Sequence, residues 1–111
     1  MARGLGQAHP EKIASLKHFF SAEAVNDLQR LHDFIAENNP IAARHTAREL
    51  LEGTRALRRF PRMGKRVVIT PGQSAPDEIR DWFSGDYVVR YFILDDRIVI
   101  LRVWHGKESR E

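Results

Sequence analysis

The sequence contains no cysteine, which excludes disulfide bonds and thiolate metal ligands. Its apolar runs are far shorter than the roughly 20 residues needed to span a bilayer, and no charged-then-apolar leader is visible. Glycine and proline number 7 and 5 of 111 residues, far below the share that a collagen needs, so a collagen is excluded. The remaining composition, 42% hydrophobic and 30% charged, predicts one globular domain. The lack of cysteine, of a leader and of a long apolar run favours a cytoplasmic protein that contacts no membrane.

The first half of the chain has helical periodicity after an irregular start. Residues 1–16 lack an apolar pattern, so we expect a flexible N-terminal tail, a domain at 17–107 and a short tail at 108–111. A short strand at 18–20 precedes Ser21, a plausible N-cap. Asn39 and Pro40 are suited to begin a second helix. The predicted core of this helical hairpin is formed by Leu28, Leu31, Ile35, Leu50, Leu51 and Leu57.

The second half of the chain changes to a strand pattern. Phe60-Pro61 ends the helical region, and residues 71–76 read as a loop. Strands are predicted at 67–70, 78–83, 87–94 and 97–104. Because helices and strands are segregated, we expect an α+β fold: an N-terminal strand and an antiparallel helical hairpin packed on a small, mainly antiparallel sheet of three to four strands.

Strict alternation along the last strand predicts which of its side chains share a face. One face would carry Val99, Leu101, Val103 and His105. The other would carry Ile98, Ile100, Arg102 and Trp104.

Cations and a histidine on the predicted sheet are the best candidates for chemistry. The five histidines show no metal-ligand pair on one helical face, and no nucleophilic serine motif or phosphate-binding glycine loop is present. His105 is suited to proton transfer, and Arg80, Arg90 and Lys107 are suited to holding a phosphate. These four residues would suffice for a metal-independent ribonuclease without a cofactor. The alternative is that they are structural residues and solvent-exposed cations.

Residues 55–66 carry six positive charges and no acid. Such an excess suits a polyanion or an acidic protein segment, whereas the alternative is a solvated helix end, where cations are favoured. Trp104 is suited to stacking on a base or on a partner side chain. The candidate partner or nucleic-acid contacts are Arg55, Arg58, Arg59, Arg62, Lys65, Arg66, Arg102 and Trp104.

Several segments together resemble the RelE/ParE toxins of bacterial type II toxin–antitoxin systems. In the first half they are Phe20-Ser21-Ala22-Glu23-Ala24, Asp27-Leu28, Ile35-Ala36-Glu37 and Asn39-Pro40-x-Ala42-Ala43. In the second half they are Leu57-x-x-Phe60-Pro61-x-Met63-Gly64, Glu78-Ile79-Arg80, Tyr87-x-x-x-Tyr91 and Ile98-Val99-Ile100-Leu101-Arg102-Val103-Trp104-His105-Gly106. The match covers roughly residues 18–107.

The resemblance implies a growth-arresting toxin that is neutralised by a cognate antitoxin. ParE-like members inhibit DNA gyrase and are not nucleases, whereas RelE-like members cleave mRNA on the ribosome. Val88 stands where those nucleases typically have a basic residue, and no tyrosine follows His105. These departures and the Asn39-Pro40 connection favour gyrase, with the ribosome-dependent endoribonuclease as the alternative. Whether the chain is an enzyme stays open at this point.

Overall fold

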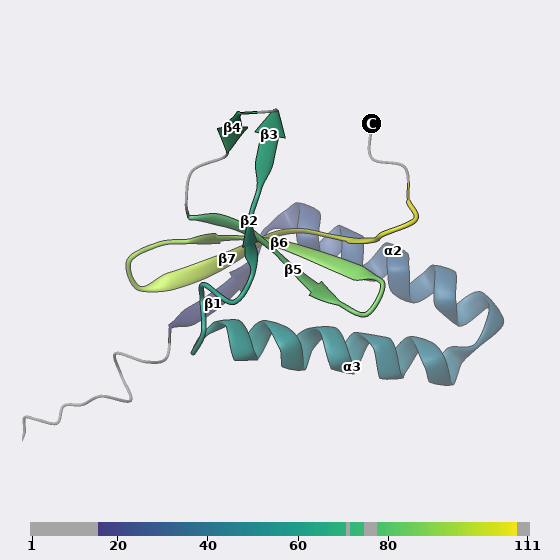
Figure 1. Cartoon of the computed structure of the whole chain (residues 1–111). Coiled ribbons are helices and arrows are strands. Elements are labelled where there is room, and N and C mark those ends of the chain that lie inside the picture. The colour runs from purple at the N-terminus through teal and green to yellow at the C-terminus, as the bar shows by residue number, and fades with distance from the viewer. Residues whose placement is uncertain (1–15, 71, 75–77, 109–111) are drawn as a thin grey trace, which may run out of the picture.

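The computed structural model describes residues 16–70, 72–74 and 78–108. Apart from Leu16, the predicted N-terminal tail lies outside the described residues. Among the described residues the first strand is β1 (Lys17–Phe20), followed by α2 (Ala22–Asn38) and α3 (Pro40–Leu57). Figure 1 shows the two helices together on one side of a sheet, which is the predicted α+β arrangement.

Local signals set the helix boundaries, as the sequence predicts. The Ser21 hydroxyl accepts a hydrogen bond from the Ala24 N–H at 3.0 Å, which caps α2. The Asn39 side chain accepts from the Ala42 N–H at 3.0 Å, and Pro40 occupies the first turn of α3. Asn39 alone joins the two helices, so they run antiparallel.

The main sheet has five strands, which are the expected N-terminal strand and four others, and it is mainly antiparallel as predicted. Besides β1, its strands are β2 (Lys65–Arg66), β5 (Ile79–Ser84), β6 (Tyr87–Ile93) and β7 (Arg97–His105). The order is β1-β7-β6-β5-β2; β1 is parallel to β7 and the other pairs are antiparallel. A separate hairpin of β3 (Val68–Thr70) and β4 (Gln73–Ser74) extends away from the helices (Figure 1).

Two short strands differ from the expected pattern. β2 lies inside the basic segment, and β4 lies inside the predicted loop 71–76. Each is two residues long, and so short a strand shows no alternation in its sequence. Pairing with a longer neighbour forms β2: Lys65 is opposite Asp81 and Arg66 is opposite Arg80.

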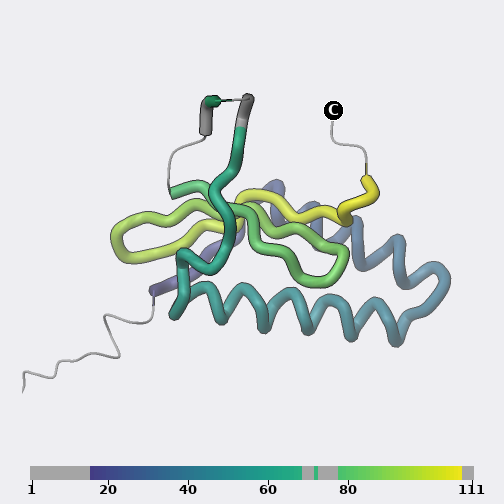
Figure 2. The backbone as a smooth tube through the Cα atoms, viewed as in Figure 1, coloured from purple at the N-terminus to yellow at the C-terminus, as the bar shows by residue number. Residues whose placement is uncertain are grey.

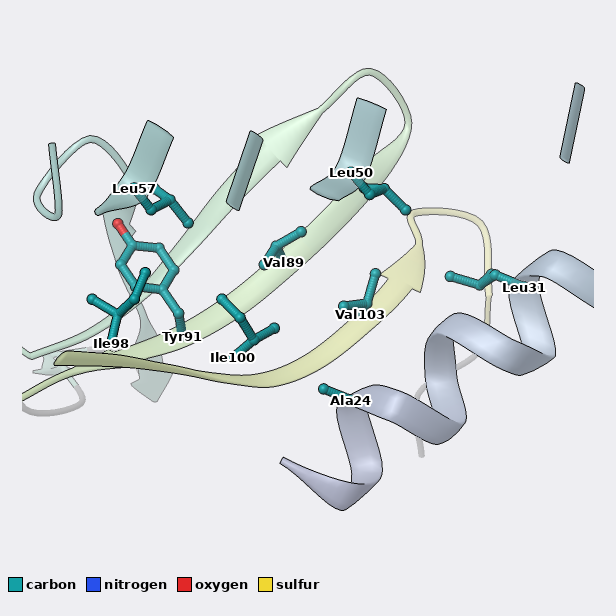
Figure 3. Packing of buried hydrophobic residues seen from close by; sticks show 9 residues of the cluster. All are labelled: Ala24, Leu31, Leu50, Leu57, Val89, Tyr91, Ile98, Ile100 and Val103. Atoms are coloured by element: carbon teal, nitrogen blue, oxygen red, sulfur yellow. The ribbon is translucent and has the colours of Figure 1, made fainter. Parts of the chain in front are cut away.

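The core lies between the sheet and the two helices (Figure 3). Its buried side chains come from both layers and are Ala24, Leu31, Leu50, Leu57, Val89, Tyr91, Ile98, Ile100 and Val103. Leu28 and Ile35 are half-buried, but the prediction that Leu51 belongs to the core is wrong, because its side chain is 42% exposed. Leu51 follows Leu50 directly on α3, so it points away from the sheet that buries Leu50.

The predicted faces of β7 are also wrong, because the strand contains a β-bulge. Arg90 pairs with Arg102, whereas the next residue, Tyr91, pairs with Ile100, so Leu101 is an extra residue. The bulge changes the alternation within the strand. Ile98, Ile100 and Val103 are therefore all buried in the core, although strict alternation separates Val103 from the other two.

Candidate partner-binding site

The bulge in β7 is stabilised by Ser21 and by the first turns of α2. It lies beyond Ile100, the last residue of β7 that pairs with β1. The Ser21 hydroxyl donates to the Leu101 carbonyl at 2.9 Å. Asp27 is buried, and its carboxylate accepts from the Val103 N–H at 2.8 Å. The start of the helix thus provides hydrogen-bond partners for backbone groups of β7 at positions where β7 is no longer paired with β1.

The Asp27 carboxylate also binds two arginines. Arg102 donates to both of its oxygens, at 2.8 and 3.1 Å, and Arg30 donates to one at 3.2 Å. Burial on its own would raise the pKa of Asp27, but the hydrogen bonds from Arg102, Val103 and Arg30 outweigh it and leave the pKa below its usual value. Arg102, predicted as a partner contact, is therefore engaged inside the domain.

A groove of about 540 Å³ lies between α2 and the C-terminal end of β7; we call it the α2–β7 groove. It is lined by Arg30, Leu31, Phe34, Ile35, Tyr87, His105, Lys107 and Glu108. His105 is opposite Tyr87, and their rings meet edge to face with centroids 5.1 Å apart. The backbone N–H of Lys107 donates to Nδ1 of His105 at 3.1 Å.

One wall of the α2–β7 groove is closed by an ion pair. Glu108 is paired with Arg30, and its other oxygen accepts from the His105 N–H at 2.8 Å. The Arg30 guanidinium therefore bridges two carboxylates, those of Asp27 and Glu108. Glu108 belongs to the predicted C-terminal tail, but its side chain contacts the domain; residues 109–111 lie outside the described residues.

Arg90 lies on the sheet face away from the helices. It forms a two-pronged ion pair with Asp81, at 2.8 and 3.0 Å, and this bonding raises the pKa of Arg90. Its guanidinium also stacks over the Trp104 ring, 5.2 Å from the centroid. The side chains of Arg90, Asp81 and Trp104 thus form one cluster on the face of the sheet that the helices do not cover.

Arg80 is the next residue before Asp81 and points to the opposite face. It donates to the Gly64 carbonyl at 2.9 Å. The hydroxyl of Tyr91, which is opposite Arg80, accepts from the Gly64 N–H at 2.9 Å and donates to the Pro61 carbonyl at 2.6 Å. Arg80 and Tyr91 together fix the chain that leaves α3.

The basic segment 55–66 runs from the end of α3 to β2. Arg58 donates to the Leu16 carbonyl at 2.6 Å, and Arg55 lies in the last helical turn. The pKa of His18 is lowered by its burial and by these two cations. The other cations of the segment are exposed, as are the large side chains of Phe60 and Met63.

Figure 2 shows that the end of α3, where the basic segment begins, and the end of β7, whose residues line the α2–β7 groove, lie at opposite ends of the molecule. The β6–β7 turn lies at the same end as the chain that leaves α3. The β5–β6 turn and the end of β7 lie at the other end, where the helical hairpin also turns. The chain therefore presents two separate candidate contact regions.

The comparisons with known proteins identify the family. The family model described as the ParE toxin of the type II toxin–antitoxin system parDE matches residues 19–110. The chain therefore belongs to this toxin family. Its curated relatives include Toxin RelE1 of Caulobacter vibrioides, 29% identical over 81% of this chain and 92% of the relative, and Toxin RelE2 of the same organism, 27% identical over 75% and 86%.

Solved structures of such toxins have the same fold. A chain of the chromosomal ParDE system from P. aeruginosa superimposes with a TM-score of 0.67, at 15% identity over 85% of this toxin and 99% of that chain. A chain of the toxin–antitoxin complex RelBE2 from Mycobacterium tuberculosis gives a TM-score of 0.59, at 24% identity over 87% and 98%. The RelE/ParE resemblance and the α+β fold inferred from sequence are thus confirmed.

In this toxin the four predicted catalytic residues do not form one cluster. His105 and Lys107 lie together at the α2–β7 groove. Arg80 is opposite Tyr91 on β6, whereas His105 is opposite Tyr87 on the same strand. These two positions on β6 are four residues apart, which is roughly 13 Å along the strand. Arg90 lies on the other face of the sheet, bound to Asp81.

Sequence reasoning missed three residues of this region: Asp27, Arg30 and Glu108. The sequence contains one signal that Asp27 is buried: it is an acidic residue at a position where the helical periodicity expects an apolar one. Among the described residues, no group of three acidic or histidine side chains is arranged to hold a metal ion. In the same part of the chain, no helix is long and apolar enough to cross a membrane.

Proposed function

We propose that this toxin arrests growth by inhibiting DNA gyrase and that a cognate antitoxin neutralises it. The observation that carries the gyrase proposal is the separation of Arg80, Arg90 and His105. Cleavage of RNA without a metal needs a proton-transfer group and phosphate-binding cations around one phosphate. Here one arginine is bound to Asp81 and the other to the Gly64 carbonyl, on opposite faces of the sheet.

The basic segment is the region best suited to contact gyrase or its DNA. Arg59 and Lys65 are exposed near Phe60 and Met63, so cations and apolar side chains lie close together in sequence. Charges at the rim of an interface mainly accelerate association and select the partner. Membership of the ParE family supports the same target.

The ribosome-dependent endoribonuclease remains the second candidate, and one observation favours it. His105, Lys107 and Arg30 surround the α2–β7 groove, so this groove offers a histidine and two cations to a substrate. The two curated relatives carry RelE names. In this second proposal His105 transfers the proton and Lys107 binds phosphate. Both candidate targets act in the cytoplasm, where we place the toxin.

A supercoiling assay with purified toxin and gyrase, run beside mRNA 5′-end mapping in induced cells, separates the two candidates. The proposal predicts blocked supercoiling or cleaved plasmid DNA, with mRNA ends unchanged. Charge reversal by Arg59→Glu with Lys65→Glu should weaken the inhibition roughly tenfold. Arg48→Glu, on the exposed side of α3, is the matched control. Normal supercoiling with excess toxin and new mRNA ends would reject the gyrase target.

The antitoxin proposal rests on the family and has its own test. The structures similar to this toxin are described as a ParDE system and as a RelBE2 toxin–antitoxin complex. Co-expression of the adjacent gene should restore growth, and its product should co-purify with the toxin. Growth arrest that persists despite full expression of that product would contradict the proposal.

A further inference from the structure

The α2–β7 groove combines an apolar wall with a cation that already holds a carboxylate. Phe34 is 68% exposed, and Leu31, Ile35 and Tyr87 continue the apolar wall beside it, so the apolar side chains are contiguous here. Arg30 lies on the same helix and is 44% exposed at its side chain. An apolar wall beside an accessible arginine suits a peptide with both apolar and acidic side chains.

We propose that the α2–β7 groove binds a segment of the antitoxin in which a carboxylate neighbours apolar side chains, and that Glu108 is an internal competitor for that carboxylate. The proposal rests on the antitoxin part of the proposed function. The incoming carboxylate replaces Glu108 on Arg30, while the apolar side chains cover Phe34 and Ile35. Glu108 therefore keeps Arg30 paired in the free toxin and is released when the antitoxin binds.

The position of Glu108 makes this exchange feasible. It follows the turn at Gly106 and Lys107, and its carboxylate is held by one side chain, Arg30, and one backbone group, the His105 N–H. Arg30 is also held by Asp27 and by the Val103 carbonyl, at 3.4 Å. Arg30 therefore stays in place when Glu108 leaves.

The charges of the groove favour a peptide over a nucleic acid. The positive charge of Arg30 is shared by two carboxylates, those of Glu108 and Asp27. A nucleic acid is bound mainly through several cations on its phosphates, and this groove offers few that are uncompensated. The apolar surface of Leu31, Phe34 and Ile35 instead matches aliphatic or aromatic side chains of a polypeptide.

Titration calorimetry of the purified toxin with the purified antitoxin tests the proposal. Phe34→Ala should weaken binding about tenfold or more, because exposed aromatic anchors dominate interface energies. Phe83→Ala is the matched control, since Phe83 is also exposed but lies on β5. Glu108→Gln should tighten binding about two- to five-fold, the range expected from removing a partly exposed competing ion pair. Glu52→Gln, on α3, is the control for loss of an acid.

Each outcome decides the proposal. Binding that is unchanged in Phe34→Ala overturns the groove, and binding that is unchanged or weakened in Glu108→Gln overturns the competitor role of Glu108, while the antitoxin proposal stands in both cases. A wild-type toxin that fails to bind the antitoxin overturns both. Displacement of bound antitoxin by a single-stranded RNA oligonucleotide, abolished by Lys107→Ala, would assign the groove to nucleic acid instead. Arg30→Gln should weaken binding, and its urea midpoint shows whether the fold survives.

Discussion

Removing the Asp27 carboxylate tests how the helices are attached to the sheet. Asp27→Ala takes the acceptor away from the buried Val103 N–H, which costs about 1–3 kcal/mol. It also removes the anion that Arg102 and Arg30 share. Both arginine side chains are more than 40% exposed, so water replaces much of what they lose, and their part is about 1 kcal/mol. We therefore expect a loss of about 2–4 kcal/mol of unfolding free energy.

Urea unfolding followed by the fluorescence of Trp82 and Trp104 measures this loss. A domain of this size has a total stability of about 5–15 kcal/mol, so the midpoint should fall by roughly 1–3 M. Asp33→Ala is the matched control: it removes an exposed acid from the same helix and should cost less than about 0.5 kcal/mol. Equal losses in the two variants would refute the reasoning.

The pH dependence gives a second check on the same carboxylate. The pKa of Asp27 is lower in the folded chain than in the unfolded one, so the folded state binds fewer protons at this site. Its stabilisation is complete above the unfolded value of about 4 and is lost as the pH falls through the folded value. The stability gap between wild type and Asp27→Ala should therefore be constant near neutral pH and narrow below about pH 4. A gap that widens in acid would contradict the charge-assisted bonding.

Two further predictions concern the packing under the sheet. Tyr91→Phe leaves the Pro61 carbonyl and the Gly64 N–H without their partner, and should cost about 1–3 kcal/mol in urea unfolding; a cost below that of Tyr87→Phe would contradict it. Gly53→Ala should destabilise by about 1–3 kcal/mol, although alanine is the better helix former, because the added methyl would clash with the Trp82 ring. The same substitution in a Trp82→Leu background should cost less.

The helices were predictable because their signals are local. Ser21 and Asn39 cap the first turns through their own side chains, and Pro40 fits only where a helix begins. The β6–β7 hairpin was predictable for the same reason, since two β-rich runs flank a short turn. Periodicity wrongly places Leu51 in the core, because it identifies the apolar stripe of a helix but not how much of that stripe the sheet buries.

The β7 bulge has no local signal. No glycine marks it, and the groups that stabilise it, the Ser21 hydroxyl and the Asp27 carboxylate, come from the other end of the chain. Sequence alternation alone therefore gave the wrong face for Val103. Hydrogen bonds of this kind join backbone groups of one strand to side chains far away in the sequence, so they can be recognised only once the tertiary fold is known.

The separation of Arg80 from Arg90 had a readable signal. Gly85 and Asp86 form a two-residue turn, in which Gly85 has a φ of +59° that glycine adopts readily. A two-residue turn fixes the hairpin register, so Arg90 must be opposite Asp81, next to Arg80 in sequence. Adjacent residues of a strand point to opposite faces, and the two arginines cannot meet at one phosphate.

The bulge links the stability of this toxin to its groove. Asp27 holds both Val103 and Arg30, and Arg30 in turn holds Glu108 at the groove. A substitution at Asp27 therefore changes the fold and the groove at once, so its effect on antitoxin binding includes an unfolding contribution. Phe34 is 68% exposed and is not a member of the buried core cluster, so we expect its replacement to leave the fold intact and to report the groove. Binding losses at Phe34 without a change in the urea midpoint separate recognition from folding in this family of small toxins.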